Sequence, residues 1–531
     1  MSKWHDIRAM LLDVVAQHET SAVFHEKREG FYQTVSYGRL LDHVVALDAV
    51  LAAQLARGTR VLLLAENGCL RATVLLALLF GGYPVVLAAE RGDAAALAAA
   101  IARADVGAVI YDERAATQAE LLAAKLPTLA IHALSAQMEA GKVATSPGEQ
   151  SFFEAPPAPD AAAMLFCGRE LCAFSATALL CAAESFAEGQ GLIDTDILLS
   201  TLPATAKDDV VLGLLAPLSV GASVAFGEGL GVLMTNMREV RPTTLLTVPY
   251  IAEKLHDKFF RMAAENGTET AVRRAIAASD PVRPLAARQI LKERLLSAAR
   301  APFGGALRCM LVVGGQLPPV KTKGLRQIGV HAATIYTTPL VAGAISMTTP
   351  QDYRDGTVGR VVKPVAVSLL APRADGAGEA CLCGKTLAVG CTEGCFTGDI
   401  ARFDKEGYLS LIGRAAHRIA LVGDDFVCPE ELEGALKQSP LVADAAVLAL
   451  SGGELAALIY PNYSCIEDML GEAYSENEVT YTLDEWIGEM NRALPAAHRI
   501  ARFALAELPL PRSKTGKLQR RVLAQFLKGV L

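Results

Sequence analysis

The chain has 531 residues, of which 52% are hydrophobic and 20% charged, and its 50 Lys and Arg against 57 Asp and Glu give a net charge of −7. So much aliphatic material excludes a globally disordered chain, and the 44 glycines and 25 prolines show no collagen-like period. The acidic balance argues against a dedicated nucleic-acid binder, which needs a basic face for phosphates. The length suggests roughly two to four domains.

Two uncharged runs, residues 72–89 and 210–227, are long enough to raise the question of a membrane helix. A bilayer-spanning helix needs about 20 uninterrupted apolar residues. The first run is broken at residues 81–84 and the second at Pro217 and Gly221, so we expect no transmembrane segment. The start of the chain lacks a signal-peptide core, and eleven scattered cysteines are typical of reduced thiols. We therefore expect a cytoplasmic protein.

Helical and strand-like patterns alternate through the first 350 residues. Helices are predicted at residues 41–55, 72–80 and 94–104, and buried strands at residues 60–64, 84–87, 108–111, 162–166, 222–226, 244–247 and 307–313. Residues 252–301 are interpreted as a largely helical surface insertion. This alternation is typical of βαβ units, so it predicts an α/β fold of stacked layers with mostly parallel sheets.

The pattern changes after residue 350. Short strands and turns at residues 357–370, 380–383 and 409–411 predict a small β-rich subdomain. Beyond Gly413 the expected order is strand 418–422, helix 430–438, strand 445–450, loop 461–480 and helix 482–493. We therefore expect a second, smaller α+β domain at the C-terminus.

The most distinctive stretch lies near the C-terminus, in residues 508–520 (LPLPRSKTGKLQR). Its prolines stiffen the approach, Gly516 permits a tight turn, and Lys517 follows at the tip. A lysine on such a turn is a movable point charge that can reach an anion. A solvated basic tail is the competing interpretation of the same residues.

A second stretch contains Thr397-Gly398-Asp399 and, 15 residues after the aspartate, Arg414. A carboxylate at a strand edge is suited to accept hydrogen bonds from a ribose diol. An arginine beyond a hairpin can return to the same site. Taken alone, the Thr-Gly-Asp sequence is more typical of a simple turn.

Together these stretches resemble the adenylate-forming superfamily of acyl-CoA synthetases, nonribosomal-peptide adenylation domains and luciferases. The order and separation of the motifs match that family. Among its members, the residue pattern is most similar to that of the fatty-acyl-CoA ligases. Further similar segments are residues 35–41, 212–222, 242–255, 312–318, 356–360 and 423–433. The resemblance therefore extends over nearly the whole chain.

The resemblance implies an N-terminal AMP-binding domain, residues 1–413, and a mobile C-terminal domain, residues 414–531, with a hinge at Ala416 and His417. In the family a carboxylic acid attacks the α-phosphate of Mg·ATP to give an acyl-adenylate, and a thiol then takes the acyl group. The implied cofactors are ATP, Mg²⁺ and coenzyme A. The implied partners are a fatty or aryl acid and coenzyme A or a carrier protein, in a monomer or homodimer.

The resemblance also implies roles for particular residues. Lys517 would be catalytic, because it would bridge the substrate carboxylate and the phosphate. The implied nucleotide-binding residues are Asp399, Arg414, Gly314, Gly315, Tyr336 and Thr338.

Two family motifs are altered. The family's phosphate loop is rich in Ser, Thr and Gly and ends in Pro-Lys, whereas this chain has Cys167-Gly168-Arg169 after the predicted strand. Phosphate cradles depend on backbone N–H groups that glycines free. The family's glutamate that serves Mg²⁺ is also missing after Tyr336, so no residue is assigned as a metal ligand.

Three hypotheses follow from this mixture of kept and altered motifs. The chain is a divergent adenylating ligase that holds phosphates with other residues. Alternatively, it is a pseudoenzyme that keeps the fold to bind an acyl ligand, a nucleotide or a partner protein. The third hypothesis is an acyl transferase that uses a preformed adenylate or thioester and needs no triphosphate site.

Two weaker constellations receive structural interpretations. Four cysteines fall within 15 residues: Cys381, Cys383, Cys391 and Cys395. Their spacing differs from that of zinc knuckles, so they are interpreted as core thiols. The acidic pair Asp208 and Asp209 is interpreted as a cap for the helix that follows it.

Overall fold

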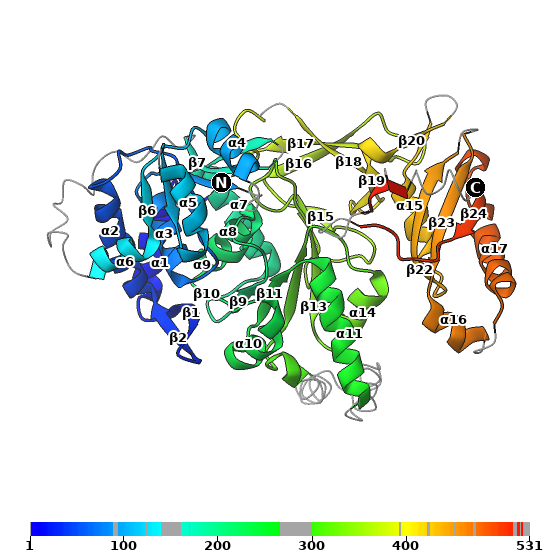
Figure 1. Cartoon of the computed structure of the whole chain (residues 1–531), viewed down its shortest axis with the longest axis horizontal. Coiled ribbons are helices and arrows are strands. Elements are labelled where there is room, and N and C mark those ends of the chain that lie inside the picture. Colours follow the sequence, from blue (N-terminus) through cyan, green and yellow to red (C-terminus); the bar gives the residue numbers. More distant parts are fainter. Residues whose placement is uncertain are drawn as a thin grey trace. The chain divides into compact units, whose positions relative to one another are not determined.

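The computed structural model describes residues 2–88, 94–123, 125–139, 161–168, 170–265, 300–391, 394–421, 425–450, 453–470, 474–512, 518–520 and 522–523. The chain forms two compact units (Figure 1). Unit 1 comprises Met1–Val367 and Leu382–Cys395, and unit 2 comprises Ser368–Cys381 and Phe396–Leu531. The expected large N-terminal and small C-terminal parts are thus present. The domain boundary at residue 413 stays a prediction.

Unit 1 contains a six-stranded sheet of order β6-β5-β3-β4-β7-β8. Its strands are β3 (Val61–Leu64), β4 (Val85–Ala88), β5 (Ala108–Tyr111), β6 (Thr128–Ala130), β7 (Ala162–Cys167) and β8 (Leu171–Ser175). All neighbours are parallel except β7 and β8. Helix α3 (Cys69–Phe80) is buried along almost its whole length, which explains the apolar run at residues 72–89 without a membrane. This run is a core helix followed by the core strand β4.

A nine-stranded sheet completes unit 1, in the order β15-β14-β13-β12-β11-β9-β10-β1-β2. Its strands are β1 (Ala22–Arg28), β2 (Phe31–Ser36), β9 (Ile197–Ser200), β10 (Ser223–Ala225), β11 (Thr244–Thr247), β12 (Cys309–Val313), β13 (His331–Tyr336), β14 (Ser346–Met347) and β15 (Arg360–Val361). Strands β10, β9, β11, β12 and β13 run parallel to one another, whereas β14 is antiparallel to β13. Their carboxyl ends therefore meet at one edge of the sheet.

Helices cover these sheets. They are α1 (Ile7–His18), α2 (Tyr37–Ala52), α4 (Ala94–Ala104), α5 (Ala116–Ala123), α6 (Ile131–Glu139), α7 (Ala176–Gln190), α8 (Lys207–Val210), α9 (Ala216–Leu218), α10 (Leu233–Val240), α11 (Pro249–Glu265) and α14 (Pro319–Gln327). Helices α11 and α14 lie side by side over β12 and β13 (Figure 1). In the described part of the chain, none of the helices is both long and apolar enough to cross a membrane. The cytoplasmic location stays a prediction.

Unit 2 holds most residues of the smaller sheets, and residues 365–367, 382–384 and 395 of these sheets fall in unit 1. The β-rich part has the order β16-β17-β18-β19, with β16 (Val365–Leu370), β17 (Gly378–Gly384), β18 (Cys395–Phe403) and β19 (Leu409–Arg414). After β20 (Ile419–Ala420) and β21 (Phe426–Val427), a three-stranded sheet is formed by β22 (Val442–Ala449), β23 (Leu455–Pro461) and β24 (Ile500–Leu505). Helices α15 (Pro429–Leu436) and α17 (Glu476–Arg492) pack on this sheet around one apolar core.

The loop predicted at residues 461–480 is wrong, because α16 (Tyr463–Leu470) and the first turn of α17 lie there. Ser475 and Glu478 form a capping box at the start of α17. Val479, Leu483 and Ile487 then recur every four residues and are buried. Because only this narrow apolar stripe of α17 is buried and the rest of the helix is polar, the helical period of its first turn was not recognised in the sequence. Much of the predicted insertion at residues 252–301 lies outside the described residues.

Candidate functional site

The carboxyl edge of the nine-stranded sheet collects several of the predicted nucleotide-binding residues. Val313 at the end of β12 pairs with Ile335 of β13, so Gly314 and Tyr336 leave neighbouring strands at the same edge. Gly314 has a φ of +83°, which favours glycine, and open space lies where a Cβ would be. Ligands of parallel α/β sheets bind at such carboxyl edges. The grouping therefore suits a binding site, and the individual roles stay predictions.

The loop after β13 is largely buried. The Thr337 hydroxyl donates a hydrogen bond of 3.0 Å to Oδ2 of Asp208. Thr338 is 7% exposed, and its hydroxyl has no hydrogen-bond partner within the described residues. A buried hydroxyl without a partner costs free energy, which a bound acceptor or donor would offset.

The altered phosphate loop is a tight hairpin. Cys167 of β7 pairs with Leu171 of β8, so only residues 168–170 connect the two strands. The Gly168 N–H donates a hydrogen bond of 3.1 Å to the Glu170 carbonyl, and the Gly168 carbonyl accepts one from Arg103. Arg169 lies outside the described residues. A triphosphate cradle needs several consecutive free N–H groups, and the Gly168 N–H is already bonded to the Glu170 carbonyl.

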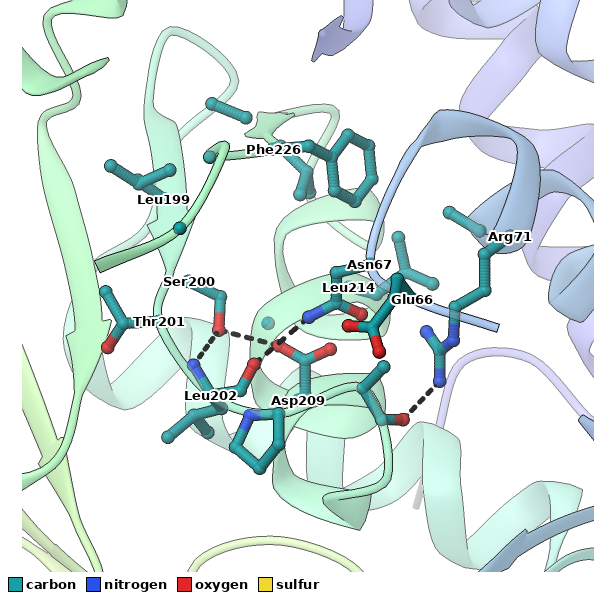
Figure 2. A pocket seen from close by; sticks show the side chains of 18 of the residues that line it. Glu66, Asn67, Arg71, Leu199, Ser200, Thr201, Leu202, Asp209, Leu214 and Phe226 are labelled. Carbon is teal, nitrogen blue, oxygen red and sulfur yellow. Dashed lines mark hydrogen bonds between the residues drawn. The ribbon is translucent and has the colours of Figure 1, made fainter. Parts of the chain in front are cut away.

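A cavity of about 420 Å³ lies at the carboxyl ends of β9 and β10, within unit 1. Figure 2 shows its polar side chains converging from separate segments. Residues 66–72, 199–214 and 224–233 contribute most of its wall. Apolar side chains such as Leu214 and Phe226 line it beside carboxylate, amide and hydroxyl groups. The volume and mixed lining are typical of small-molecule sites.

Asp209 is the buried carboxyl group of this cavity. It accepts a hydrogen bond of 2.6 Å from the Ser200 hydroxyl, and Asn67 lies beside it (Figure 2). Burial raises the pKa of the Asp209 carboxyl, while the nearby Arg71 guanidinium opposes that rise. Arg71 also donates to the Ala204 carbonyl. The role of Asp209 was missed at the sequence level because Asn67 and Arg71, which lie beside it, come from a distant part of the chain.

The interpretation of Asp208 and Asp209 as a helix cap is wrong. The N-cap of α8 is Ala206, and no side chain caps it. Asp208 instead contacts the ammonium of Lys207 at 2.6 Å through Oδ1, while its Oδ2 accepts the Thr337 hydroxyl. Lys207 is 4% exposed and Asp208 is 18% exposed. Asp208 therefore contacts the loop after β13, whereas Asp209 lines the cavity.

Asp399 and Arg414 meet within unit 2. They are paired residues on the antiparallel strands β18 and β19, and a guanidinium nitrogen of Arg414 lies 2.6 Å from Oδ1 of Asp399. The Asp399 N–H also donates to the Thr397 hydroxyl at 3.0 Å. The Asp399 side chain is 10% exposed and that of Arg414 is 49% exposed. The expected contact across the hairpin is present, and the nucleotide-binding roles stay predictions.

Lys517 lies outside the described residues, but the chain on both sides of residues 513–517 is anchored. Arg512 and Leu518 form a bridge, and Arg512 donates to Asp444 at 2.6 to 2.9 Å. Arg520 donates to both carboxylate oxygens of Glu433, at 2.6 and 2.9 Å. Bidentate arginine–carboxylate contacts fix geometry as well as charge.

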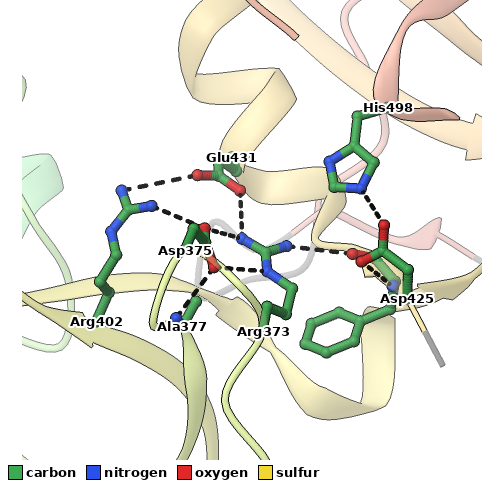
Figure 3. A network of polar contacts seen from close by, with 8 residues as sticks. Arg373, Asp375, Ala377, Arg402, Asp425, Glu431 and His498 are labelled. Atoms are coloured by element: carbon green, nitrogen blue, oxygen red, sulfur yellow. Dashed lines mark hydrogen bonds and ion pairs between the residues drawn. The ribbon is translucent and has the colours of Figure 1, made fainter. Parts of the chain in front are cut away.

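The predicted hinge residues lie in the 3₁₀ turn Ala415–His417, where His417 contacts Glu430 at 2.6 Å. Arg373 connects segments on the two sides of this turn, because it binds Asp375 and Glu431 (Figure 3). Its guanidinium also donates to the Phe426 carbonyl. These residues all belong to unit 2. The hinge itself stays a prediction.

The cysteine cluster is only partly in the core. Cys381 is buried, whereas Cys383 is exposed, so the core interpretation is wrong for Cys383. The two cysteines are separated by one residue in β17. The buried part of this strand ends between them. Within the described residues, no group of three His, Cys, Asp or Glu side chains is placed to hold a metal ion.

Comparison with protein families identifies the chain. Residues 12–390 match the AMP-binding enzyme family, which is more than half of the chain. The chain belongs to the AMP-binding enzyme family. Residues 417–529 match the C-terminal domain of AMP-binding enzymes. The predicted membership of the adenylate-forming superfamily is confirmed.

Relatives of this family member include fatty-acid ligases. The chain is 27% identical over 286 residues to the long-chain-fatty-acid–CoA ligase ACSBG1 of Rattus norvegicus, a match that covers 48% of this chain and 39% of that protein. It is 25% identical over 342 residues to the long-chain-fatty-acid–CoA ligase FadD15 of Mycobacterium bovis, covering 57% of this chain and 56% of that protein. The chain thus spans about two fifths to just over half of the length of these relatives.

Solved structures share the fold over the whole chain. The anthranilate CoA ligase AuaEII in complex with anthranoyl-AMP has a TM-score of 0.74 at 16% identity, covering 100% of this chain and 99% of that one. Apo MatB of Rhodopseudomonas palustris has a TM-score of 0.74 at 18% identity, with both chains covered completely. At these identities the likeness establishes the fold alone.

Proposed function

We propose that the chain is an ATP-dependent, AMP-forming ligase that activates a carboxylic acid as an acyl-adenylate and transfers the acyl group to a thiol. The single observation that carries this proposal is the Asp399–Arg414 contact of 2.6 Å. It supplies a carboxylate for the ribose diol beside a cation for the same nucleotide. Family membership and the fatty-acid ligase relatives support the reaction class.

The acid is proposed to occupy the cavity in unit 1. Its mixed lining suits a carboxylic acid whose body is largely apolar and which carries some hydrogen-bonding group. Asp209 is buried in this cavity and accepts the Ser200 hydroxyl, so it is available as a hydrogen-bonding group beside the acid. A fatty or aryl acid fits this description, with coenzyme A or a carrier arm as the thiol.

In this mechanism a carboxylate oxygen of the acid attacks the α-phosphorus of ATP, and the bond to the bridging oxygen of pyrophosphate breaks. The thiol, as its thiolate, then attacks the acyl carbonyl carbon, and AMP leaves. Lys517 is proposed to stabilise the negative charge shared by the carboxylate and the phosphate, while Arg520 and Glu433 hold its segment in place.

The described residues around the loop after β13 do not fit a divalent cation, because Lys207 and Thr337 already occupy the two oxygens of the Asp208 carboxylate and no group of three metal-ligating side chains is present among the described residues. At the β7–β8 hairpin, the Gly168 N–H already donates to the Glu170 carbonyl, so Gly168 does not offer this N–H to a phosphate.

Acid-dependent exchange of labelled pyrophosphate into ATP tests the proposal. The wild-type chain is expected to support exchange with at least one member of a panel of fatty and aryl acids. Lys517→Ala is expected to lower the rate at least a hundredfold, since charged contacts to a reacting group typically contribute about 3 kcal/mol or more. Exchange that persists unchanged in Lys517→Ala would contradict the mechanism.

The three-residue β7–β8 turn favours a second candidate, an acyl transferase that takes a preformed acyl-adenylate and needs no triphosphate site. This candidate predicts that the chain transfers the acyl group of a synthetic acyl-adenylate to coenzyme A. It also predicts that the chain gives no pyrophosphate exchange with any acid.

A further inference from the structure

The cavity in unit 1 presents a hydrogen-bond acceptor that no described residue satisfies. Asn67 lines this cavity beside Asp209 (Figure 2). The side-chain oxygen of Asn67, Oδ1, is buried and has no hydrogen-bond partner in the described part of the chain. A buried acceptor without a donor costs free energy, which a donor on a bound molecule would offset.

The nitrogen of the Asn67 amide fixes which atom is left without a partner. Nδ2 donates a hydrogen bond of 3.1 Å to the Leu202 carbonyl, which can only accept. Burial raises the pKa of the Asp209 carboxyl, and a hydrogen bond with the Asn67 side chain is among the contacts that oppose this rise. Exchanging the two ends of the amide would place its oxygen against the Leu202 carbonyl, so Oδ1 is the unsatisfied atom.

Asp209 supplies further acceptor positions at the same place. Its carboxyl group is 7% exposed and accepts the Ser200 hydroxyl at 2.6 Å through Oδ1. A carboxylate has about four acceptor sites, so this contact leaves capacity for a donor from a ligand. Gly213 lies one helical turn later, and a Cβ there would be only 3.2 Å from Oδ1 of Asp209. The glycine therefore keeps the surroundings of this oxygen uncrowded.

The charges around the cavity favour a neutral donor over an ammonium group. Two acids and two arginines of its lining balance in charge: Glu66, Asp209, Arg71 and Arg114. A third lining acid, Glu228, is ion-paired with Lys27 at 3.1 Å. The described lining thus has no excess of negative charge to offset the cost of burying an ammonium. A hydroxyl group carries no charge and needs only the acceptor that Asn67 provides.

We propose that the acid bound in this cavity carries a hydroxyl group that donates a hydrogen bond to Oδ1 of Asn67 and lies against the carboxyl group of Asp209. The apolar body of the acid then contacts side chains such as Leu214 and Phe226. This inference rests on the proposed function, because it names the class of acid that the reaction uses. A site built to bind a hydroxyl rejects the analogue that lacks it, since its buried polar group is then left unpaired. Asn67 and Asp209 are therefore specificity-determining residues for a hydroxy acid.

Calorimetric titration of the full chain with matched acids tests the inference without requiring catalysis. The probes are octanoic acid with its ω-hydroxy, ω-methoxy and ω-amino derivatives, and benzoic acid with its para- and meta-hydroxy and methoxy derivatives. At least one hydroxy acid is expected to bind at least tenfold more tightly than its unsubstituted parent. The matching methoxy acid keeps the oxygen but has no donor, so it is expected to lose this gain.

Variants assign the preference to Asn67. Asn67→Leu is expected to reduce the ratio of hydroxy-acid to parent affinity to less than threefold, whereas Asn67→Ser keeps an oxygen acceptor and is expected to retain part of the ratio. Asn462→Leu is the matched control, because the Asn462 amide also donates to a backbone carbonyl, that of Pro440 at 3.0 Å, but lies in unit 2. Circular dichroism and the melting temperature establish that each variant is folded. The comparison of acids in the wild-type chain decides the matter if Asn67→Leu does not fold.

The outcomes separate this inference from the proposed function. Equal affinities for every hydroxy acid and its parent, or an equal gain from the methoxy acid, overturn the inference even if acids are activated. Tighter binding of the ω-amino acid than of the ω-hydroxy acid, an unchanged ratio in folded Asn67→Leu, or failure of all the acids to bind also overturns it. An Asn67-dependent preference for a hydroxy acid, in a chain without acid-dependent pyrophosphate exchange, supports the inference and removes the ligase.

Discussion

Asp399 and Arg414 face each other across β18 and β19, with a guanidinium nitrogen 2.6 Å from a carboxylate oxygen. The contact spans a hairpin, and it leaves Arg414 half exposed while Asp399 is nearly buried. A charge-assisted contact of this kind fixes the orientation of both side chains. The proposed ribose-binding role of the pair depends on this fixed geometry.

Asp399→Ala is expected to weaken AMP binding about 30-fold, because truncating one partner of a hydrogen-bonded charge pair costs about 2 kcal/mol or more. Calorimetric titration with AMP measures the change. Glu406→Ala, an exposed acid in the same hairpin, is the control and should bind AMP as the wild type does. Unchanged AMP affinity in Asp399→Ala would remove the assigned role.

Glu433→Gln is expected to impair catalysis more than nucleotide binding. Glu433 is 4% exposed and holds Arg520, three residues beyond Lys517, so its loss releases the segment that carries the lysine. We expect the acid-activation rate to fall at least tenfold while AMP affinity changes less than twofold. Glu430 still contacts Arg520 at 3.1 Å, so the unfolding free energy should fall by less than the ~3 kcal/mol typical of breaking a buried ion pair completely. Urea unfolding and pyrophosphate exchange on the same preparation measure both effects. A parallel loss of AMP affinity would point to general damage instead.

Leu214→Trp is expected to shift acid selectivity toward smaller acids. Leu214 lines the cavity in unit 1, and an indole ring in its place would fill part of the 420 Å³. The expected result is loss of exchange with the largest accepted acids, with AMP affinity retained. Leu121→Trp, at an exposed position of α5, is the control. An unchanged ranking of acids in a folded Leu214→Trp variant would place the acid elsewhere.

His331 is expected to make the stability of the chain depend on pH. Burial, and then the Arg326 charge, lower the pKa of His331 from 6.5 to about 4. Between these values the unfolded chain binds the proton more readily than the folded chain, so unfolding free energy falls as the pH drops from 6.5 toward 4. The contribution lost is on the order of 2 to 4 kcal/mol. His331→Gln should flatten this part of the curve in urea unfolding at several pH values. An equally steep loss in the variant would assign it to other groups.

Arg373→Met is expected to loosen the part of unit 2 around residues 415–417. Burial opposes the shift, but hydrogen bonds from Arg373 and the Ala377 N–H lower the pKa of Asp375 to about 2. That contribution is present above pH 4 and is lost as the pH falls toward 2, so the variant should show a weaker acid-dependent loss of stability. Limited proteolysis near residues 415–417 should also be faster than in wild type. Arg499→Met, outside this network, should be cleaved at the wild-type rate.

The sequence predicted the fold well where local periodicity and burial agree. Helix 94–104 and strands 108–111 and 244–247 coincide with α4, β5 and β11, because each is a short run with one clear pattern. It failed at α16 and α17, where polar surfaces conceal a narrow apolar stripe. The Asp399–Arg414 contact was predictable because one hairpin separates the two residues.

The same reasoning could not find Asp209 or the link between Asp208 and Thr337. Asp209 meets Ser200 and Asn67, and Asp208 meets a residue 129 positions later in the chain. Such contacts depend on the order of strands in the nine-stranded sheet. The spacing of residues within one segment of the sequence therefore does not predict them. The helix-cap interpretation was the best local explanation of two adjacent acids, and the tertiary packing overrode it.

Transfer of oxygen from the acid to AMP tests the central claim most directly. The chain is incubated with Mg·ATP, coenzyme A and an accepted acid whose carboxylate carries ¹⁸O, and the AMP is analysed by mass spectrometry. If the acid attacks the α-phosphate and the thiol then releases AMP, one labelled oxygen remains on the AMP. Unlabelled AMP, or label recovered in inorganic phosphate together with ADP, would contradict an acyl-adenylate and with it the proposed reaction.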